Sequence, residues 1–215
     1  MKNVLFRASA VGKLMTAPKT KAEGPLSVGA KTHIRSLASQ EIFGIDFEFT
    51  SKETEKGIRM ESDAIGLLNR VRGLSLSKNT ERRSDDFFTG ECDLFDASNL
   101  RGHDLKCSWS ASTFPLLSSD CEDKIYEWQA RVYMRLWKAK EWSIDYALLS
   151  TPEDLCKWEP QTMHFVDHIP EHMRLTSWIV KHCPEKEAAM IEKIDAAREY
   201  YAQVIADFQE QHQPS

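Results

Sequence analysis

Hydrophobic residues recur at helical spacing in four segments of the chain, residues 28–42, 56–71, 123–140 and 185–211. Ser27 stands directly before the first segment and can cap it, and Gly44 marks its end. Gly73 closes the second segment in the same way. A shorter helix is expected over residues 7–16, with Ser9 near its N-cap. The last segment predicts one long amphipathic helix in the C-terminal tail.

Alternation of hydrophobic and polar residues predicts strands between these helices. Residues 45–50 (IDFEFT) and 143–150 (SIDYALLS) read as short strands, and residues 90–110 have the pattern of a two-stranded hairpin. Residues 151–155 indicate a turn into a short helix. This order of elements predicts an α/β (α+β) fold with a central mixed sheet flanked by helices. The length favours one domain over residues 1–215.

Three of the charged residues of the hairpin, Asp93, Asp104 and Lys106, lie where part of a hydrophobic core is expected. On the second strand, the two-residue period places Asp104 and Lys106 on one face and Leu105 on the other. On the first strand, Asp93 points away from an apolar row, and antiparallel pairing can bring it beside Asp104. Two carboxylates and one ammonium group are therefore predicted to converge.

This cluster has the composition of a metal-dependent hydrolytic site. Hard divalent ions such as Mg²⁺ take oxygen ligands and are usually held by one or two carboxylates together with substrate phosphates. Asp93 and Asp104 can supply the carboxylates, and Lys106 can orient an attacking water or stabilise negative charge on phosphorus. Gln129 lies on the apolar stripe of residues 123–140, where a buried amide needs a polar partner. The cluster predicts metal-assisted phosphodiester hydrolysis.

Charge is distributed unevenly along the chain. The net charge is −5, which by itself does not indicate nucleic-acid binding. Residues 1–43 contain seven Lys or Arg and two Glu, a net charge of +5 that leaves −10 for the remainder. The N-terminal segment is therefore the part of the chain that is suited to contact phosphates.

The cysteine, histidine and hydropathy patterns exclude several other classes. The five cysteines never occur as CxxC, so neither a disulfide framework, nor a zinc knuckle, nor a four-cysteine iron–sulfur cluster is indicated. His164, His168 and His172 recur every four residues, but Pro170 interrupts any helix that would align them for zinc. No segment resembles a signal peptide or a membrane helix. We expect a cytoplasmic protein.

Four motifs, in this order, resemble those of the PD-(D/E)xK nucleases and, among them, the phage lambda exonuclease and YqaJ-like recombination exonucleases. Residues 55–65 (EKGIRMESDAI) look like the family's KGxxxE helix, and residues 88–95 (FTGECDLF) look like its GxxD strand. Residues 103–110 (HDLKCSWS) are similar to the D/E-x-K strand, and residues 126–134 (YEWQARVYM) to the YxxQxxxY helix. Acids and lysines are common in a chain with 28% charged residues, so the joint order carries the resemblance.

The resemblance implies a role for each residue of the acidic cluster. Asp93, Asp104 and the backbone carbonyl of Leu105 would hold a first metal ion. Glu61 would support a second metal ion or its water. Lys106 would position the nucleophile. Each of these roles is implied by the likeness to the family.

Further residues are implied outside that cluster, because the resemblance extends from about residue 7 to residue 152. Gln129 would steady the site. Arg7 and Ser9 lie in the segment where the family grips a terminal 5′-phosphate, although their spacing differs from the lambda pattern. Cys92 stands where many relatives have proline, which changes the stiffness of the strand rather than the chemistry.

The resemblance also implies an activity. The protein would be a Mg²⁺-dependent 5′-to-3′ exonuclease on linear double-stranded DNA, with Mn²⁺ able to replace Mg²⁺. It would leave 3′ single-stranded tails for a single-strand annealing protein in phage-type recombination. Relatives form homotrimer rings around DNA, and the basic N-terminal segment can line such a channel. A phage or prophage gene in a bacterial cell would encode it.

Two other functions are compatible with the same motifs. A Cas4-like or RecB-like nuclease would differ in polarity or substrate, and such nucleases often carry the four-cysteine cluster that the spacing here argues against. A non-catalytic DNA-binding module on the same fold would have no need to retain Asp93, Asp104 and Lys106 together. Cleavage of linear duplex with and without Mg²⁺ distinguishes an active nuclease from the non-catalytic module.

Overall fold

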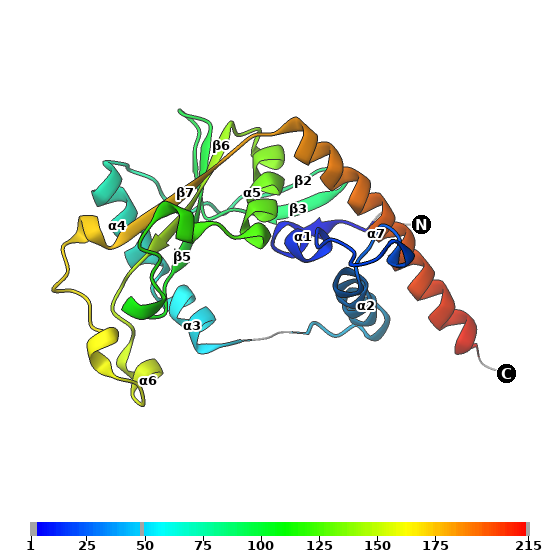
Figure 1. Cartoon of the computed structure of the whole chain (residues 1–215), viewed down its shortest axis with the longest axis horizontal. Coiled ribbons are helices and arrows are strands. Elements are labelled where there is room, and N and C mark those ends of the chain that lie inside the picture. The colour runs from blue at the N-terminus through cyan, green and yellow to red at the C-terminus, as the bar shows by residue number, and fades with distance from the viewer. Residues whose placement is uncertain (1–3, 48–49, 214–215) are drawn as a thin grey trace.

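The computed structural model describes residues 4–47 and 50–213 (Figure 1). Its larger sheet has four strands in the order β4-β5-β6-β7. Their bounds are Leu94–Asp96, Arg101–Cys107, Glu141–Ala147 and Leu175–Lys181. β5 and β6 run parallel, whereas β4 pairs with β5 and β7 pairs with β6 in the antiparallel sense.

A second, three-stranded sheet has the order β1-β3-β2, with bounds Phe6–Arg7, Phe88–Glu91 and Arg82–Ser84. The predicted mixed α/β class is confirmed, but the strands expected in one central sheet are divided between two. The division falls inside the predicted hairpin, because β3 ends at Glu91 and β4 begins at Leu94. Asp93 therefore lies in the short connection between the sheets.

Seven α-helices surround the sheets in the described residues (Figure 1). Their bounds are α1 Ala8–Leu14, α2 Val28–Phe43, α3 Lys52–Arg59, α4 Glu61–Arg72, α5 Lys124–Trp137, α6 Glu153–Cys156 and α7 Pro184–Gln211. Ser27 caps α2 as expected, because its Oγ accepts from the Ala30 N–H. α7 is the long C-terminal helix, which packs along α2. No helix among the described residues is long and apolar enough to cross a bilayer.

Two local predictions were wrong at the N-terminal end. Arg7, rather than Ser9, is the N-cap of α1, and no side chain caps that helix. Residues 45–47 form no strand, because Ile45 and Phe47 stay more than half exposed and the Phe47 N–H bonds to the Gln40 side chain instead of a neighbouring strand. Residues 48 and 49 of that expected strand lie outside the described residues.

The helix expected over residues 56–71 is two helices that meet at Met60, where the backbone (φ −97°, ψ 5°) leaves the helical region. The apolar face of α4, which includes Ala64, Leu67 and Leu68, packs on the four-stranded sheet. α3 buries only Lys56 completely. α3 therefore buries a charged side chain and α4 buries apolar ones, which one straight helix would not allow.

Two apolar clusters cover opposite faces of the four-stranded sheet. Trp142 and Ile144 of β6 face α5 in the larger cluster. Ala147 of β6 and Leu105 of β5 face α4 in the smaller one. Because side chains alternate along a strand, Asp104 and Lys106, which flank Leu105 in the sequence, lie on the opposite face, toward α5. α5 is therefore the helix whose side chains can complete the charged cluster.

Candidate active site

The structure brings Asp93, Asp104 and Lys106 together where β4 pairs with β5. Lys106 Nζ lies 2.7 Å from Asp104 Oδ2. Asp93 Oδ2 accepts a hydrogen bond of 2.6 Å from the Leu105 N–H, so the carboxylate is held against β5 although it precedes β4. The convergence expected from strand periodicity is present, with a backbone bond that the sequence pattern does not reveal.

The environment of the two carboxylates is poor in hydrogen-bond donors. Asp104 is only 3% exposed, and its Oδ2 makes the ion pair with Lys106 but receives no properly oriented hydrogen bond. Burial, and then the negative charge of Asp104, raise the pKa of Asp93. Burial works to lower the pKa of Lys106, but the charge of Asp104, the close contact with its carboxylate and the charge of Asp93 together outweigh burial, and the pKa is raised. The site therefore contains the Lys106 ammonium group beside carboxylate oxygens that have unused lone pairs.

One face of α5 completes the cluster. Gln129 Nε2 donates to Asp104 Oδ1 and to Tyr133 Oη, each at 3.3 Å. Tyr133 Oη in turn donates to the Glu91 carbonyl at 3.0 Å. Lys106 Nζ lies 4.5 Å from the centre of the Tyr126 ring. The motif YxxQxxxY thus places three side chains on one helical face, at spacings of three and four residues.

Gly90, the glycine of the GxxD motif, makes room for the Tyr133 ring. A Cβ at Gly90 would lie 2.8 Å from Tyr133 Cε1, so only glycine allows the ring to approach β3 this closely. Sequence reasoning identified Gln129 but not Tyr133, whose position in the motif was the available signal.

Glu61 lines the same small cavity as Asp93, but Glu61 and the two aspartates do not form a cluster of metal ligands. The cavity has a volume of about 260 Å³ and is lined by residues of α3 and α4 together with Lys78, Asp93, Leu105 and Cys107. Glu61 Oε2 is paired with Lys78, a residue that the sequence did not single out. In residues 4–47 and 50–213, no group of three or more His, Cys, Asp or Glu side chains is arranged to hold a metal ion.

Arg7 and Ser9 line a separate cavity of about 50 Å³ on the other side of Tyr133. Arg82 of β2 also lines it and is paired with Glu91 at 3.3 Å. The structure therefore brings Arg7 and Ser9 together and adds a second guanidinium that the sequence did not indicate. Tyr133 is shared between this cavity and the Gln129 contact.

The histidines of the 164–172 segment do not meet. His164 is buried, with Nδ1 3.0 Å from Thr151 Oγ1 and Nε2 3.1 Å from Glu159 Oε2. His168 and His172 are exposed. His164 therefore belongs to the packing of the loop that carries α6.

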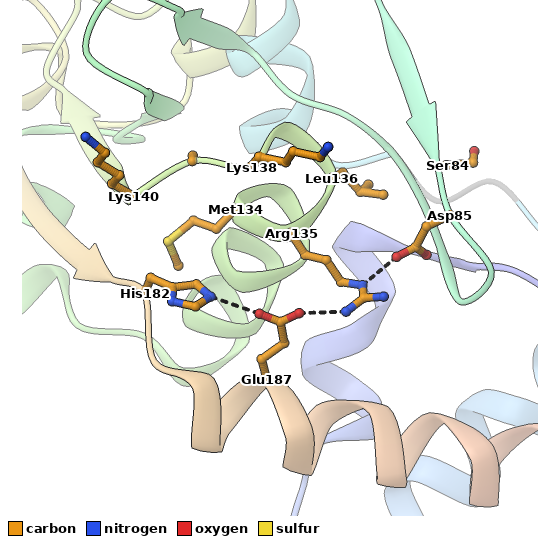
Figure 2. A pocket seen from close by; sticks show the side chains of 10 residues that line it. Ser84, Asp85, Met134, Arg135, Leu136, Lys138, Lys140, His182 and Glu187 are labelled. Carbon is orange, nitrogen blue, oxygen red and sulfur yellow. Dashed lines mark hydrogen bonds and ion pairs between the residues drawn. The ribbon is translucent and has the colours of Figure 1, made fainter.

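A larger cavity, of about 720 Å³, lies at the C-terminal end of α5 (Figure 2). Arg135 is held between Asp85 and Glu187 at 2.5 and 2.6 Å, and His182 Nε2 lies 2.9 Å from Glu187 Oε2 (Figure 2). One guanidinium is thus shared between two carboxylates, and none of the predicted site residues lines the cavity. Its size alone does not make it the candidate site.

Comparison with solved structures places the chain in a family. It is similar to the crystal structure of a phage-related exonuclease from Haemophilus somnus 129PT, with 33% identity, coverage of 96% of this chain and 97% of that chain, and a TM-score of 0.89. An alkaline exonuclease from Laribacter hongkongensis has the same fold at 13% identity, covering 96% and 92% of the two chains with a TM-score of 0.68. No protein-family model matches the sequence, and no curated protein is similar to it.

The fold and the charged cluster define a nuclease of the PD-(D/E)xK class. Within that class the chain belongs to the phage-related exonucleases of the lambda exonuclease and YqaJ-like group. It is an enzyme of the phosphodiesterase type.

Proposed function

We propose that the protein is a divalent-metal-dependent exodeoxyribonuclease that degrades one strand of linear double-stranded DNA from the 5′ end. The observation that carries this proposal is the convergence of a buried carboxylate, Asp104, and a partly buried one, Asp93, beside one lysine. Asp93 Oδ2 accepts from the Leu105 N–H at 2.6 Å, and Asp104 Oδ2 pairs with Lys106 Nζ at 2.7 Å. Family membership supports the exonuclease activity.

The donor set fits a hard divalent cation. Asp93, Asp104 and the carbonyl of Leu105 would hold Mg²⁺, and Mn²⁺ would substitute, because these are oxygen ligands of the kind both ions accept. Burial and the negative charge of Asp104 raise the pKa of Asp93, although the Lys106 ammonium works against them. Glu61 would support a second ion or its water. When bound, the cation supplies Lewis-acid stabilisation of charge on the phosphoryl oxygens.

The protein's own residues divide the remaining work. Lys106 keeps its proton and presents a positive charge where the phosphate is attacked, which orients the water nucleophile and stabilises developing negative charge. Gln129 restrains the Asp104 carboxylate through Oδ1, while Oδ2 lies against the Lys106 ammonium. The Tyr126 ring lies against the Lys106 ammonium and limits its orientation.

The cavity at Arg7 and Ser9 would bind the terminal 5′-phosphate. Arginine can hold a phosphate through two parallel N–H bonds, and Ser9 offers a hydroxyl donor. Arg82 adds a second guanidinium at the same place. A terminal phosphate carries more negative charge than an internal diester, so the cavity would favour chain ends over internal sites.

The wider biology follows from the family. We infer that digestion leaves 3′ single-stranded tails for an annealing protein, that three copies form a ring around DNA, and that a phage or prophage gene produces the enzyme in the bacterial cytoplasm. The basic N-terminal segment would line the ring while the acidic remainder faces solvent. Light scattering that finds only monomer at micromolar concentration would contradict the ring.

A cleavage assay tests the activity directly. Linear duplex labelled at the 5′ or the 3′ end and a covalently closed circle are each incubated with the enzyme, with Mg²⁺ and with EDTA. We expect Mg²⁺-dependent release of the 5′ label as mononucleotide, slow loss of the 3′ label and an intact circle. Cutting of the circle would indicate an endonuclease, and early release of the 3′ label would indicate the opposite polarity.

A further inference from the structure

Lys56 on α3 is completely buried, with 0% of its surface exposed. Lysine is rarely buried to this extent unless its charge is paired. No carboxylate of the described residues pairs with it within 4 Å. Instead, Nζ donates to three backbone carbonyls, those of Ser108 at 2.7 Å, Trp109 at 3.0 Å and Leu149 at 2.8 Å. All three N–H bonds of the ammonium group are therefore used.

These carbonyls stand at the ends of the two central strands. β5 ends at Cys107 and β6 ends at Ala147, and because the strands are parallel their carboxyl ends meet at one edge of the sheet. Carbonyls beyond a strand end have no partner in the ladder and need a donor when they are buried. Lys56 supplies that donor to both strands at once.

A buried polar network extends from the same contact. The Trp109 carbonyl also accepts from Thr151 Oγ1 at 2.9 Å, and Thr151 Oγ1 meets His164 Nδ1 at 3.0 Å. The loop before α6 is thus fastened to the same strand ends. Lys56 thus joins α3 to this network, beginning two residues beyond Lys106 at Ser108.

The position of α3 determines the shape of the cavity beside Asp93. Thr54, Gly57 and Ile58 of α3 line this cavity together with Glu61, Asp93 and Leu105. Glu61 is the first residue of α4 and follows α3 after the break at Met60. Any movement of α3 away from the strand ends would widen the cavity and carry Glu61 with it.

We propose that Lys56 is a positioning residue for the nuclease site, whose ammonium group holds α3 against the ends of β5 and β6 so that Glu61 lines the same cavity as Asp93. The inference rests on the proposed metal-dependent function, since it assigns Glu61 and Asp93 to one site. Lys56 itself contacts neither carboxylate. Its effect passes through the backbone of α3 and the Met60 break.

The alternative is that Lys56 only stabilises the fold. Both roles predict a lower melting temperature for Lys56→Met, because the Ser108 and Leu149 carbonyls lose the Lys56 donor and the Trp109 carbonyl keeps the Thr151 hydroxyl alone. Only positioning predicts a change in metal affinity beyond what lost stability explains. Arg59 provides a matched control, because it also fastens α3, through an exposed ion pair of 2.7 Å with Asp154, but contributes nothing to the strand ends.

The test compares the full-length parent with Lys56→Met, Lys56→Gln and Arg59→Met. Lys56→Gln retains two N–H donors on a shorter side chain and serves if Lys56→Met does not fold. The rise in melting temperature is measured against Mn²⁺ and Mg²⁺ concentration without DNA, and DNA binding is measured in EDTA. We expect the midpoint concentration to rise by about 10- to 100-fold for Lys56→Met and less for Lys56→Gln. Arg59→Met should keep the parental midpoint, and DNA binding in EDTA should be unchanged.

The outcomes separate the two proposals. If the parent shows no metal-dependent rise in melting temperature, the proposed metal function fails and this inference fails with it. If the parent responds and the folded Lys56 variants respond at the same concentrations, the positioning role alone is wrong. A shift of equal size in Arg59→Met would also overturn the inference, because any loosening of α3 would then suffice.

Discussion

The backbone N–H of Leu105 donates a hydrogen bond of 2.6 Å to Asp93 Oδ2. This bond joins the connection between the two sheets to the middle of β5 and fixes the Asp93 carboxylate one residue away from Asp104. In an extended strand the N–H and C=O of one residue point to the same edge. The Leu105 carbonyl therefore points to the side on which Asp93 lies, which is the arrangement that the proposed ligand set requires.

Replacement of Lys106 should separate binding from chemistry. Lys106→Ala removes the charge beside Asp104 but neither carboxylate, so we expect duplex binding in Ca²⁺ to persist while Mg²⁺-dependent hydrolysis slows by about 10²- to 10³-fold. Fluorescence anisotropy and single-turnover cleavage measure the two quantities. Loss of DNA binding together with cleavage would show that Lys106 is structural.

Gln129 should have a smaller effect that passes through Asp104. Gln129→Leu removes the donor to Asp104 Oδ1 and to Tyr133 Oη, so the carboxylate loses its restraint. We expect cleavage to fall by about 10- to 100-fold and the Mg²⁺ concentration for half-maximal activity to rise. Tyr133→Phe is the control that keeps the amide in place, and it should shift the Mg²⁺ requirement less. An unchanged Mg²⁺ requirement in Gln129→Leu would remove Gln129 from the site.

The cavity at Arg7 should confer preference for a 5′-phosphate. Linear duplex with 5′-phosphates should be digested faster than the same duplex with 5′-hydroxyls, and Arg7→Ala should reduce this preference more than it reduces cleavage of hydroxyl ends. Arg82→Ala should act in the same direction. Rising salt should weaken digestion, because phosphate contacts release counterions. Equal rates on both kinds of end for the parent would leave the cavity without this role.

The burial of Lys56 has a consequence for the pH dependence of stability. Burial lowers the pKa of Lys56 from an ordinary value of 10.5 to about 8. Between these values the unfolded chain binds more protons than the folded protein, so this group makes stability rise with pH from about 8 to 10.5. The slope would approach about 1.4 kcal/mol per pH unit relative to Lys56→Met. Denaturant unfolding of both proteins across this range measures it, and parallel curves would contradict the lowered pKa.

Sequence periodicity predicted the helices better than the strands, for physical reasons that particular residues show. α5 and α7 carry long apolar stripes, and Ser27 and Gly44 mark the ends of α2 in the way their side chains and backbone require. β7 was missed because its central residues are only partly buried and do not alternate clearly. The break at Met60 was missed because the burial of Lys56 depends on carbonyls about 50 and 90 residues further along the chain.

The candidate site was predictable in its charged residues and less so in their supports. Asp93, Asp104 and Lys106 follow from the two-residue period of the hairpin and from the family motifs. Gln129 follows from a polar residue on an apolar stripe. The pairing of Glu61 with Lys78 and the presence of Arg82 beside Arg7 depend on how separate elements pack, which no local pattern encodes.

The most direct test of the proposed nuclease site is the effect of Asp104→Asn on Mg²⁺-dependent digestion of linear duplex DNA. The substitution keeps the size of the side chain and its contact with Gln129, and it removes the charge that pairs with Lys106. We predict that the variant folds, retains the duplex in a binding assay and releases no more nucleotide in Mg²⁺ than the parent releases in EDTA. Digestion by purified Asp104→Asn at the parental rate would contradict the account.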